Sequence, residues 1–224
     1  DPFDNKIIWS GCYDGGLDVT DTRTGLSHDV RPWPQAGYGV APADMKYRWH
    51  WNFPMALSRH QRGAVYVGSQ YVHKTTDGGH TWKVISPDLT TNTKSHQQSS
   101  GGIVSDNLMT FDGCTLFAIA ESPIKKGMIW VGSNDGQVQL TTNDGASWTN
   151  LTANLNLPAW GTISNIDPSN FDAGTAYVTV HYQLQGDFKA YLFKTADYGK
   201  HWTNIGQKLP ESNSGFVHFV KEDP

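Results

Sequence analysis

The 224-residue chain has a formal net charge of −4, with 17% charged residues, 12% aromatic residues and 23 glycines. It is long enough for a substantial core, has no basic run of the kind that binds nucleic acid, and has no apolar stretch approaching the ~20 residues of a membrane-spanning helix. Frequent glycines and aromatic residues favour an all-β protein of short strands and tight turns.

The first unit begins with a predicted hairpin. Residues 6–11 and 17–20 are rich in β-forming side chains and flank the pair Asp14-Gly15. This pair favours a hairpin because both turn positions tolerate positive φ. A second turn at Thr24-Gly25 leads into residues 26–30.

A connection rich in proline and glycine follows over residues 31–44, longer than an ordinary hairpin loop. In residues 47–53 aromatic and polar side chains then alternate, which predicts a strand with one aromatic and one polar face. The polar face of this predicted strand consists of Arg48, His50 and Asn52.

Three further units repeat one order of strands. The predicted strands are 49–56, 64–68, 71–74 and 83–85 in the second unit; 115–120, 128–132, 137–140 and a strand from 148 onward in the third; and 161–166, 175–180, 190–193 and 202–205 in the fourth. Residues 216–220 are predicted as the first strand of a fifth unit. Four strands per repeat at a regular spacing describe a β-propeller.

A motif of the form Thr-x-Asp/Asn-x-Gly-x-x-Trp marks the last turn of each of these units, at residues 75–82, 141–148 and 195–202. Its Asp or Asn can accept backbone N–H groups, its Gly supplies positive φ, and its Trp buries a large apolar area. We therefore expect a structural role for the motif residues: Asp77, Gly79, Trp82, Asn143, Gly145, Trp148, Asp197, Gly199 and Trp202.

The motif resembles the Asp-box, or bacterial neuraminidase repeat, of β-propellers. Residues 47–54, 84–90 and 120–123 resemble the sortilin-type, glycosyl-hydrolase-like repeat proteins of bacteria. The resemblance implies a secreted, periplasmic or cell-envelope protein longer than this chain, although the chain starts at Asp1 without a signal peptide. The prediction is a single all-β section of a larger propeller, truncated at both ends, with about four four-stranded antiparallel blades at 1–57, 58–121, 122–166 and 167–222.

The Asp-box resemblance raises the question of sialidase activity, which needs arginines from several blades to hold a carboxylate. No arginine follows Arg62, so the third and fourth units contribute none. A glycoside hydrolase of the carboxylate-pair type needs two facing acidic side chains. The candidates outside the motifs and turns, none of them in a catalytic motif, are Asp44, Asp106, Asp112, Glu121 and Asp187.

A ligand-binding site is predicted instead on the polar face of residues 47–53, which would line the central channel if this strand is the first of its blade. Aromatic residues on the connections could form a rim for sugars or peptides. The residues of this predicted site are Arg48, His50, Asn52, Tyr47 and Trp160, and Trp33 and Tyr38 extend the rim. We favour the alternative interpretation, in which the polar residues of this face are hydrogen-bonded structural residues and the aromatic residues cover blade junctions.

Neither cysteine spacing nor histidine spacing indicates a metal site, and no cofactor is expected. Cys12 and Cys114 form no C-x-x-C pair and are either a disulfide or two free thiols. Two functions stay open: a non-catalytic binding or scaffolding propeller, and part of a glycoside hydrolase whose site is completed by other blades. The expected partners are a protein, a glycan, or further blades of the same or another chain, with no nucleic acid and no membrane span.

Overall fold

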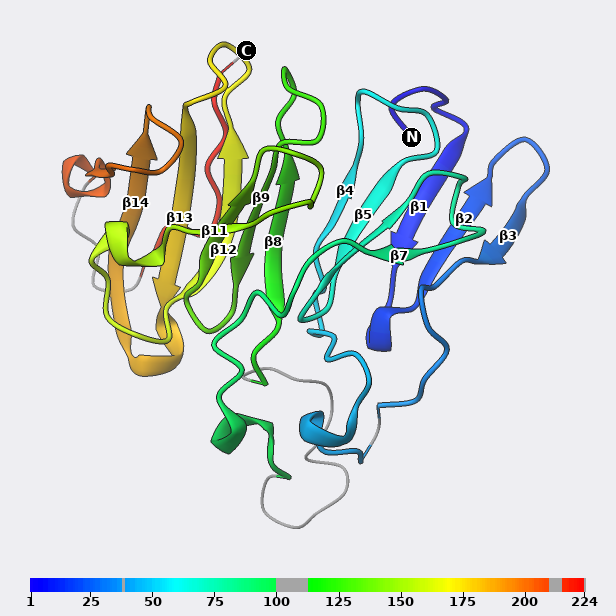
Figure 1. Ribbon diagram of the computed structural model, residues 1–224, viewed down its shortest axis with the longest axis horizontal. Coiled ribbons are helices and arrows are strands. Elements are labelled where there is room, and N and C mark those ends of the chain that lie inside the picture. The colour runs from blue at the N-terminus through cyan, green and yellow to red at the C-terminus, as the bar shows by residue number, and fades with distance from the viewer. Residues whose placement is uncertain (38, 100–112, 210–214, 224) are drawn as a thin grey trace. The chain divides into compact units, whose positions relative to one another are not determined.

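The computed structural model describes residues 1–37, 39–99, 113–209 and 215–223, and it divides into two compact units, Asp1–Leu116 and Phe117–Pro224. The regular structure in these residues consists of β-strands and short 3₁₀ helices (Figure 1). The strands form four antiparallel sheets, each of which follows the order of the chain.

The first unit holds a three-stranded and a four-stranded sheet. The first sheet consists of β1 (Ile7–Gly11), β2 (Leu17–Asp21) and β3 (Leu26–Asp29). The second sheet consists of β4 (Met55–Leu57), β5 (Val65–Gly68), β6 (Val72–Thr75) and β7 (Lys83–Val84). The connections carry the 3₁₀ helices η1 (Tyr13–Gly15), η2 (Pro42–Asp44) and η3 (Lys94–Gln97).

The second unit holds two four-stranded sheets. The third sheet consists of β8 (Leu116–Glu121), β9 (Ile129–Ser133), β10 (Val138–Thr141) and β11 (Thr149–Asn150). The fourth consists of β12 (Thr162–Pro168), β13 (Ala176–Tyr182), β14 (Asp187–Thr195) and β15 (Thr203–Asn204). The 3₁₀ helices are η5 (Thr152–Leu155), η6 (Gln183–Gln185) and η7 (Gly206–Lys208).

Within each unit, a glycine near the end of one strand lets the next sheet approach closely. A Cβ added at Gly132, at the end of β9, would lie 2.3 Å from Cγ2 of Ile163 on β12. A Cβ at Gly11, at the end of β1, would lie 3.0 Å from the ring of Phe53 just before β4. Successive sheets therefore pack face to face through a position that only glycine fits without rearrangement.

The predicted all-β propeller architecture is confirmed, with three strands instead of four in the first sheet. The sheets cover residues 7–29, 55–84, 116–150 and 162–204. The repeat boundaries expected at 57/58 and 121/122 fall after the first strand of a sheet, and the boundary at 166/167 falls inside β12. Each of these predicted boundaries therefore leaves all or most of the first strand of a sheet in the preceding repeat.

Two predicted strands are wrong. Residues 47–53 form no strand, because side chains take the place of a ladder: Arg48 N–H donates to Gln70 Oε1 at 2.8 Å, and Tyr47 O accepts from Gln35 Nε2 at 2.6 Å. Residues 215–223 also contain no strand. There, Val220 N–H donates to Asn165 Oδ1 at 3.1 Å, again a backbone group bonded to a side chain.

Candidate functional site

The three turn motifs lie between the third and fourth strands of their sheets. In the first motif, Asp77 Oδ1 accepts the Thr81 N–H at 2.9 Å, and Thr75 Oγ1 accepts the Gly79 N–H at 3.0 Å. The same bonds recur around Asn143 in the second motif and around Asp197 in the third. These side chains are therefore engaged in holding the turn.

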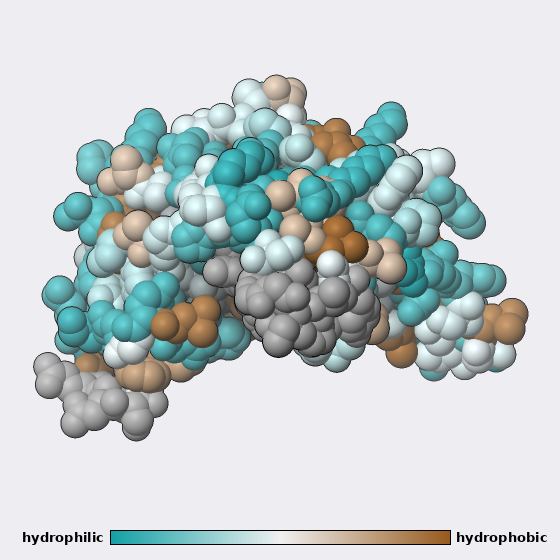
Figure 2. Space-filling view, turned by 90° about the horizontal axis from the view of Figure 1, so that it is seen from below, coloured by the Kyte–Doolittle hydropathy of each residue, from teal (hydrophilic) through white to brown (hydrophobic). Residues whose placement is uncertain are grey.

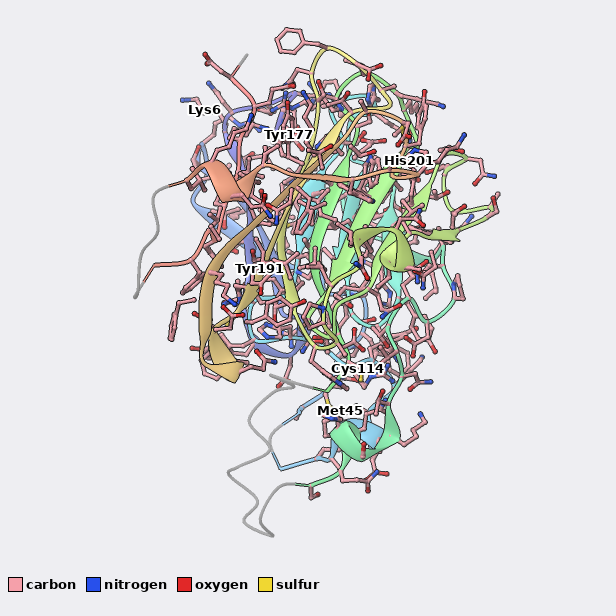
Figure 3. All side chains as sticks on the ribbon, turned by 90° about the vertical axis from the view of Figure 1, so that its left-hand side faces the viewer. Lys6, Met45, Cys114, Tyr177, Tyr191 and His201 are labelled. Atoms are coloured by element: carbon pink, nitrogen blue, oxygen red, sulfur yellow. The ribbon has the colours of Figure 1, made fainter. Side chains whose placement is uncertain are left out.

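Each of two motifs also contacts the sheet that precedes it in the same unit. Trp82 Nε1 donates to Val30 O at 2.8 Å, and a Cβ at Gly79 would lie 2.6 Å from Val30 Cβ. In the second unit, Gly199 lies against Leu151, and its carbonyl accepts from Asn154 Nδ2 at 2.8 Å. His201, labelled in Figure 3, belongs to this motif, and its Nδ1 lies 2.6 Å from Asp197 Oδ2. The motifs thus fasten neighbouring sheets.

Arg48 joins several segments inside the first unit. It is 5% exposed, its Nη2 lies 2.7 Å from Asp88 Oδ2, and its Nε donates to Cys114 O at 3.1 Å. Nη2 also reaches Thr90 Oγ1 at 3.4 Å. Because the guanidinium is buried and bonded to groups of the protein itself, its pair with Asp88 has the geometry of a structural ion pair.

The other polar residues of the predicted face do not line up with Arg48. His50 is 5% exposed, its Nδ1 accepts the Asn52 N–H at 3.0 Å, and burial lowers its pKa to about 4. Trp49 between them is also buried, whereas Asn52 is exposed. Arg48, Trp49 and His50 therefore all point inward, and the predicted polar strand face does not form.

An aromatic cluster surrounds this region at one end of the first unit. Trp33 packs edge to face on Tyr47, with 6.4 Å between ring centroids, and Trp51 lies 4.0 Å from Tyr13 of η1. The buried ring of Trp49 lies 5.3 Å from Phe53 and 6.3 Å from Tyr47. These ring contacts form two groups, the Tyr13–Trp51 pair and a set that is centred on Tyr47 and Trp49. Both groups together are called the aromatic cluster, and its members are Tyr13, Trp33, Tyr47, Trp49, Trp51, Phe53 and Tyr71.

Part of the aromatic cluster is open to solvent. Tyr13 and Trp33 are each 41% exposed, and Trp51 is half-buried. Lys46 Nζ lies 3.2 Å from the Trp33 ring centroid, and Asp14 Oδ2 accepts the Gly37 N–H at 2.9 Å. This second bond ties the long connection to η1. The rings are thus held by fixed loops.

The surface at this end is mixed in character. Around the atoms drawn in grey, the face in Figure 2 shows mainly hydrophilic side chains with small separate hydrophobic groups. Figure 3 places Met45 and Cys114 at the same end. Aromatic rings set among polar groups, without a broad apolar face, suit a polar ligand with flat apolar sides.

Trp160 belongs to the second unit and lies on the connection that enters β12. It is half-buried and has φ of 67°, a left-handed conformation. Its carbonyl accepts from Gln185 Nε2 at 2.9 Å. Trp160 thus belongs to a different unit from the aromatic cluster.

The three candidate acidic residues that the structure describes lie on three different elements, η2, β8 and β14. Asp44 is exposed in η2, Glu121 Oε1 accepts the Gly127 N–H at 3.0 Å, and Asp187 Oδ2 accepts from Tyr191 Oη at 2.8 Å. Asp106, Asp112 and the rim residue Tyr38 lie outside the described residues. Hydrogen bonding, above all from the Lys189 N–H, lowers the pKa of Asp187, whereas a general acid needs a raised pKa.

Sequence reasoning missed Tyr13 as part of this region. Its signal was weak, since Tyr13 stands beside an Asp-Gly turn and only folding places Trp51 against it. Cys12 and Cys114 are not joined by a disulfide; Cys12 is exposed and Cys114 is buried. In the described residues, no helix is long and apolar enough to cross a membrane and no group of three or more His, Cys, Asp or Glu could hold a metal ion.

Comparison with known proteins supports the fold. No protein-family model matches the chain. An oligoxyloglucan-reducing end-specific xyloglucanase of Emericella nidulans is 23% identical over 239 residues, which cover 96% of this chain and 27% of the relative.

Solved structures of propeller enzymes are similar to the chain at low identity. An ancestral GH74 enzyme matches with a TM-score of 0.57 and 13% identity over 92% of this chain and 23% of its own. The GH74 enzyme of Niastella koreensis matches with a TM-score of 0.55 and 16% identity over 90% of this chain and 28% of its own. The GH74 xyloglucanase of Xanthomonas campestris matches with a TM-score of 0.53 and 16% identity over 91% of this chain and 29% of its own. This chain spans about a quarter of the length of these relatives. At these identities the likeness establishes a β-propeller fold; the finer Asp-box and sortilin-type resemblance stays a prediction.

Proposed function

We propose that this chain is a carbohydrate-binding section of a β-propeller in a larger secreted or cell-envelope protein. It contributes a surface that holds a glycan, and the acid/base chemistry, if the whole protein has any, is supplied elsewhere. The observation that carries the proposal is the aromatic cluster, whose Tyr13, Trp33 and Trp51 rings are partly open to solvent.

The chemistry of the cluster favours a neutral saccharide. One flat side of a pyranose ring presents C–H groups that pack on an aromatic ring, while its hydroxyls stay hydrogen-bonded to water or to polar neighbours. Rings held by fixed loops lose little conformational entropy when a ligand binds. The relatives named as xyloglucanases support a β-glucan of the xyloglucan type as the ligand.

The carboxylates of the described residues support a binding role. Where the pKa of a described Asp or Glu departs from its ordinary value, hydrogen bonds or ion pairs lower it, so the group stays ionised at neutral pH. The groups with such a lowered pKa are Asp21, Asp29, Asp77, Asp187, Asp197 and Glu222. None of these is prepared to donate a proton to a glycosidic oxygen.

The second candidate function is a segment of a glycoside hydrolase whose catalytic pair is completed by other blades. The observation that favours it is the similarity to GH74 enzymes along nearly the whole chain. The two functions predict the same glycan binding by this chain and differ in whether glycan is also hydrolysed.

Affinity electrophoresis of the chain through gels that contain xyloglucan, mixed-linkage glucan, mannan, starch or pectin tests the proposal. Retardation by a neutral β-glucan, with no new reducing ends after prolonged incubation, is the expected result. Release of reducing ends by the chain alone would favour the hydrolase, and a folded chain that no glycan retards would overturn the proposal.

A further inference from the structure

Trp160 has a backbone conformation that its position in the repeat does not explain. Among the described residues, two aromatic residues have positive φ, Trp160 at 67° and Tyr198 at 62°. Tyr198 fills a turn-motif position at which Gly78 and Asp144 also have positive φ, so the turn itself requires that conformation. Trp160 stands outside the motifs. A bulky residue held in this region is strained, and such strain gathers at sites that bind ligands.

The neighbouring hairpins hold the Trp160 connection in place. Tyr182 Oη donates to Pro158 O at 2.7 Å, and Gln185 Nε2 donates to Trp160 O at 2.9 Å. The Tyr182 ring covers Gly161, where an added Cβ would lie 2.4 Å from Tyr182 Cζ. Hydrogen bonds to the carbonyls of Pro158 and Trp160 therefore hold the backbone that carries the indole.

The same arrangement of elements occurs at the aromatic cluster of the first unit. There, Trp51 lies on the connection into the second sheet and packs on Tyr13, which belongs to the β1–β2 connection of the first sheet. In the second unit, Trp160 lies on the connection into the fourth sheet. A Cβ at Gly136, in the β9–β10 connection of the third sheet, would lie 3.5 Å from the Trp160 backbone nitrogen. Trp51 and Trp160 thus occupy corresponding places in the two units.

We propose that Trp160 is a second saccharide-stacking position, which takes one pyranose ring of the same neutral glycan class on its half-exposed indole. This inference rests on the proposed carbohydrate-binding function and adds a position in the second unit. The hydrogen bonds to the carbonyls of Pro158 and Trp160 restrict the loop, so that part of the ordering cost of binding is met when the protein folds. The ligand contact is the packing of pyranose C–H groups on the ring face.

The test is isothermal titration of the chain with a xyloglucan oligosaccharide, together with thermal unfolding of each variant. Trp160→Gly removes the indole and also relieves the positive φ, because glycine adopts it without strain. We expect Trp160→Gly to weaken binding about tenfold, as one aromatic contact commonly does, and to leave the melting temperature unchanged or higher. Trp160→Phe keeps a ring and should retain most of the affinity.

Tyr198→Gly is the matched control, since it makes the same change at an aromatic residue with positive φ and 39% exposure in a turn motif. Its affinity should equal that of the unmodified chain. If Trp160→Gly lowers the melting temperature and leaves the affinity unchanged, the indole is a packing residue and the inference is wrong. If the unmodified chain binds no glycan, the proposed function fails first, and the two failures are distinguishable.

Discussion

Replacing Arg48 by methionine is expected to destabilise the first unit by about 3 kcal/mol without changing the intrinsic affinity of the folded chain for glycan. The guanidinium is 5% exposed, lies 2.7 Å from the Asp88 carboxylate and donates to Cys114 O at 3.1 Å. Both bonds are charge-assisted, because the guanidinium is the donor; at about 1.5 kcal/mol each they account for the expected loss, to which the Asp88 charge left behind adds. Methionine fills much of the volume of the arginine stem, so the polar contacts account for most of the change.

Urea unfolding followed by tryptophan fluorescence measures this loss. Arg23→Met is the control, because Arg23 pairs with Asp21 at the surface and its own side chain is 52% exposed; we expect its loss of stability to be much smaller than that of Arg48→Met. The double variant Arg48→Met/Asp88→Asn should lose less than the sum of the single variants. The reasoning is refuted if Arg48→Met retains full stability, and a selective loss of glycan affinity would return Arg48 to the binding site.

Three further predictions concern packing and pH. Gly132→Ala should destabilise the second unit by about 1–3 kcal/mol in thermal unfolding, because the added Cβ would lie 2.3 Å from Ile163 Cγ2. Full stability of this variant would mean that the two sheets are not closely packed at Gly132. Trp82→Phe should cost about 1 kcal/mol in urea unfolding by losing the bond to Val30 O, and an unchanged midpoint would contradict a fastening role. Burial, with a smaller effect of Lys46, lowers the pKa of His73 to about 3, so its neutral form stabilises the fold above the unfolded pKa of about 6.5. That contribution should fall by roughly 2 kcal/mol at pH 5 in urea titrations, a decline that His73→Gln should reduce.

Much of the fold follows from local sequence signals. Repeated β-rich runs, the Asp-Gly pairs and the motif that ends at Trp82 predict short antiparallel strands, because each acts within a few residues. The register of the sheets follows from the same turns. These signals place most strands within a few residues of their position in the structure.

The predicted strand over residues 47–53 shows where local pattern is insufficient. Alternation of aromatic and polar residues is typical of a strand, yet Arg48 bonds Asp88 and Cys114, which lie 40 and 66 residues further along the chain. With such distant partners, Arg48 and His50 point inward and the segment does not pair with a strand. A single sequence does not reveal them, because the pairing depends on how the loops fold together.

The aromatic contacts could be predicted only in part from the sequence. Tyr47 and Trp33 were expected at an aromatic rim, and they do lie in one aromatic cluster. Tyr13 was not expected, because its contact with Trp51 joins two connections that are separated by the whole first sheet. Trp160 was predicted as a residue of the same site; it belongs to the second unit, and its positive φ is visible only in the structure.

The most direct measurement of the central claim is isothermal titration of a xyloglucan oligosaccharide into the chain and into its Tyr13→Ala/Trp51→Ala variant. Removing two partly exposed rings that together contribute about 2 kcal/mol should weaken binding about thirtyfold. Phe171→Ala, at a 69% exposed aromatic residue outside the cluster, should leave the affinity unchanged. Equal affinity of the folded double variant and the unmodified chain would contradict the account.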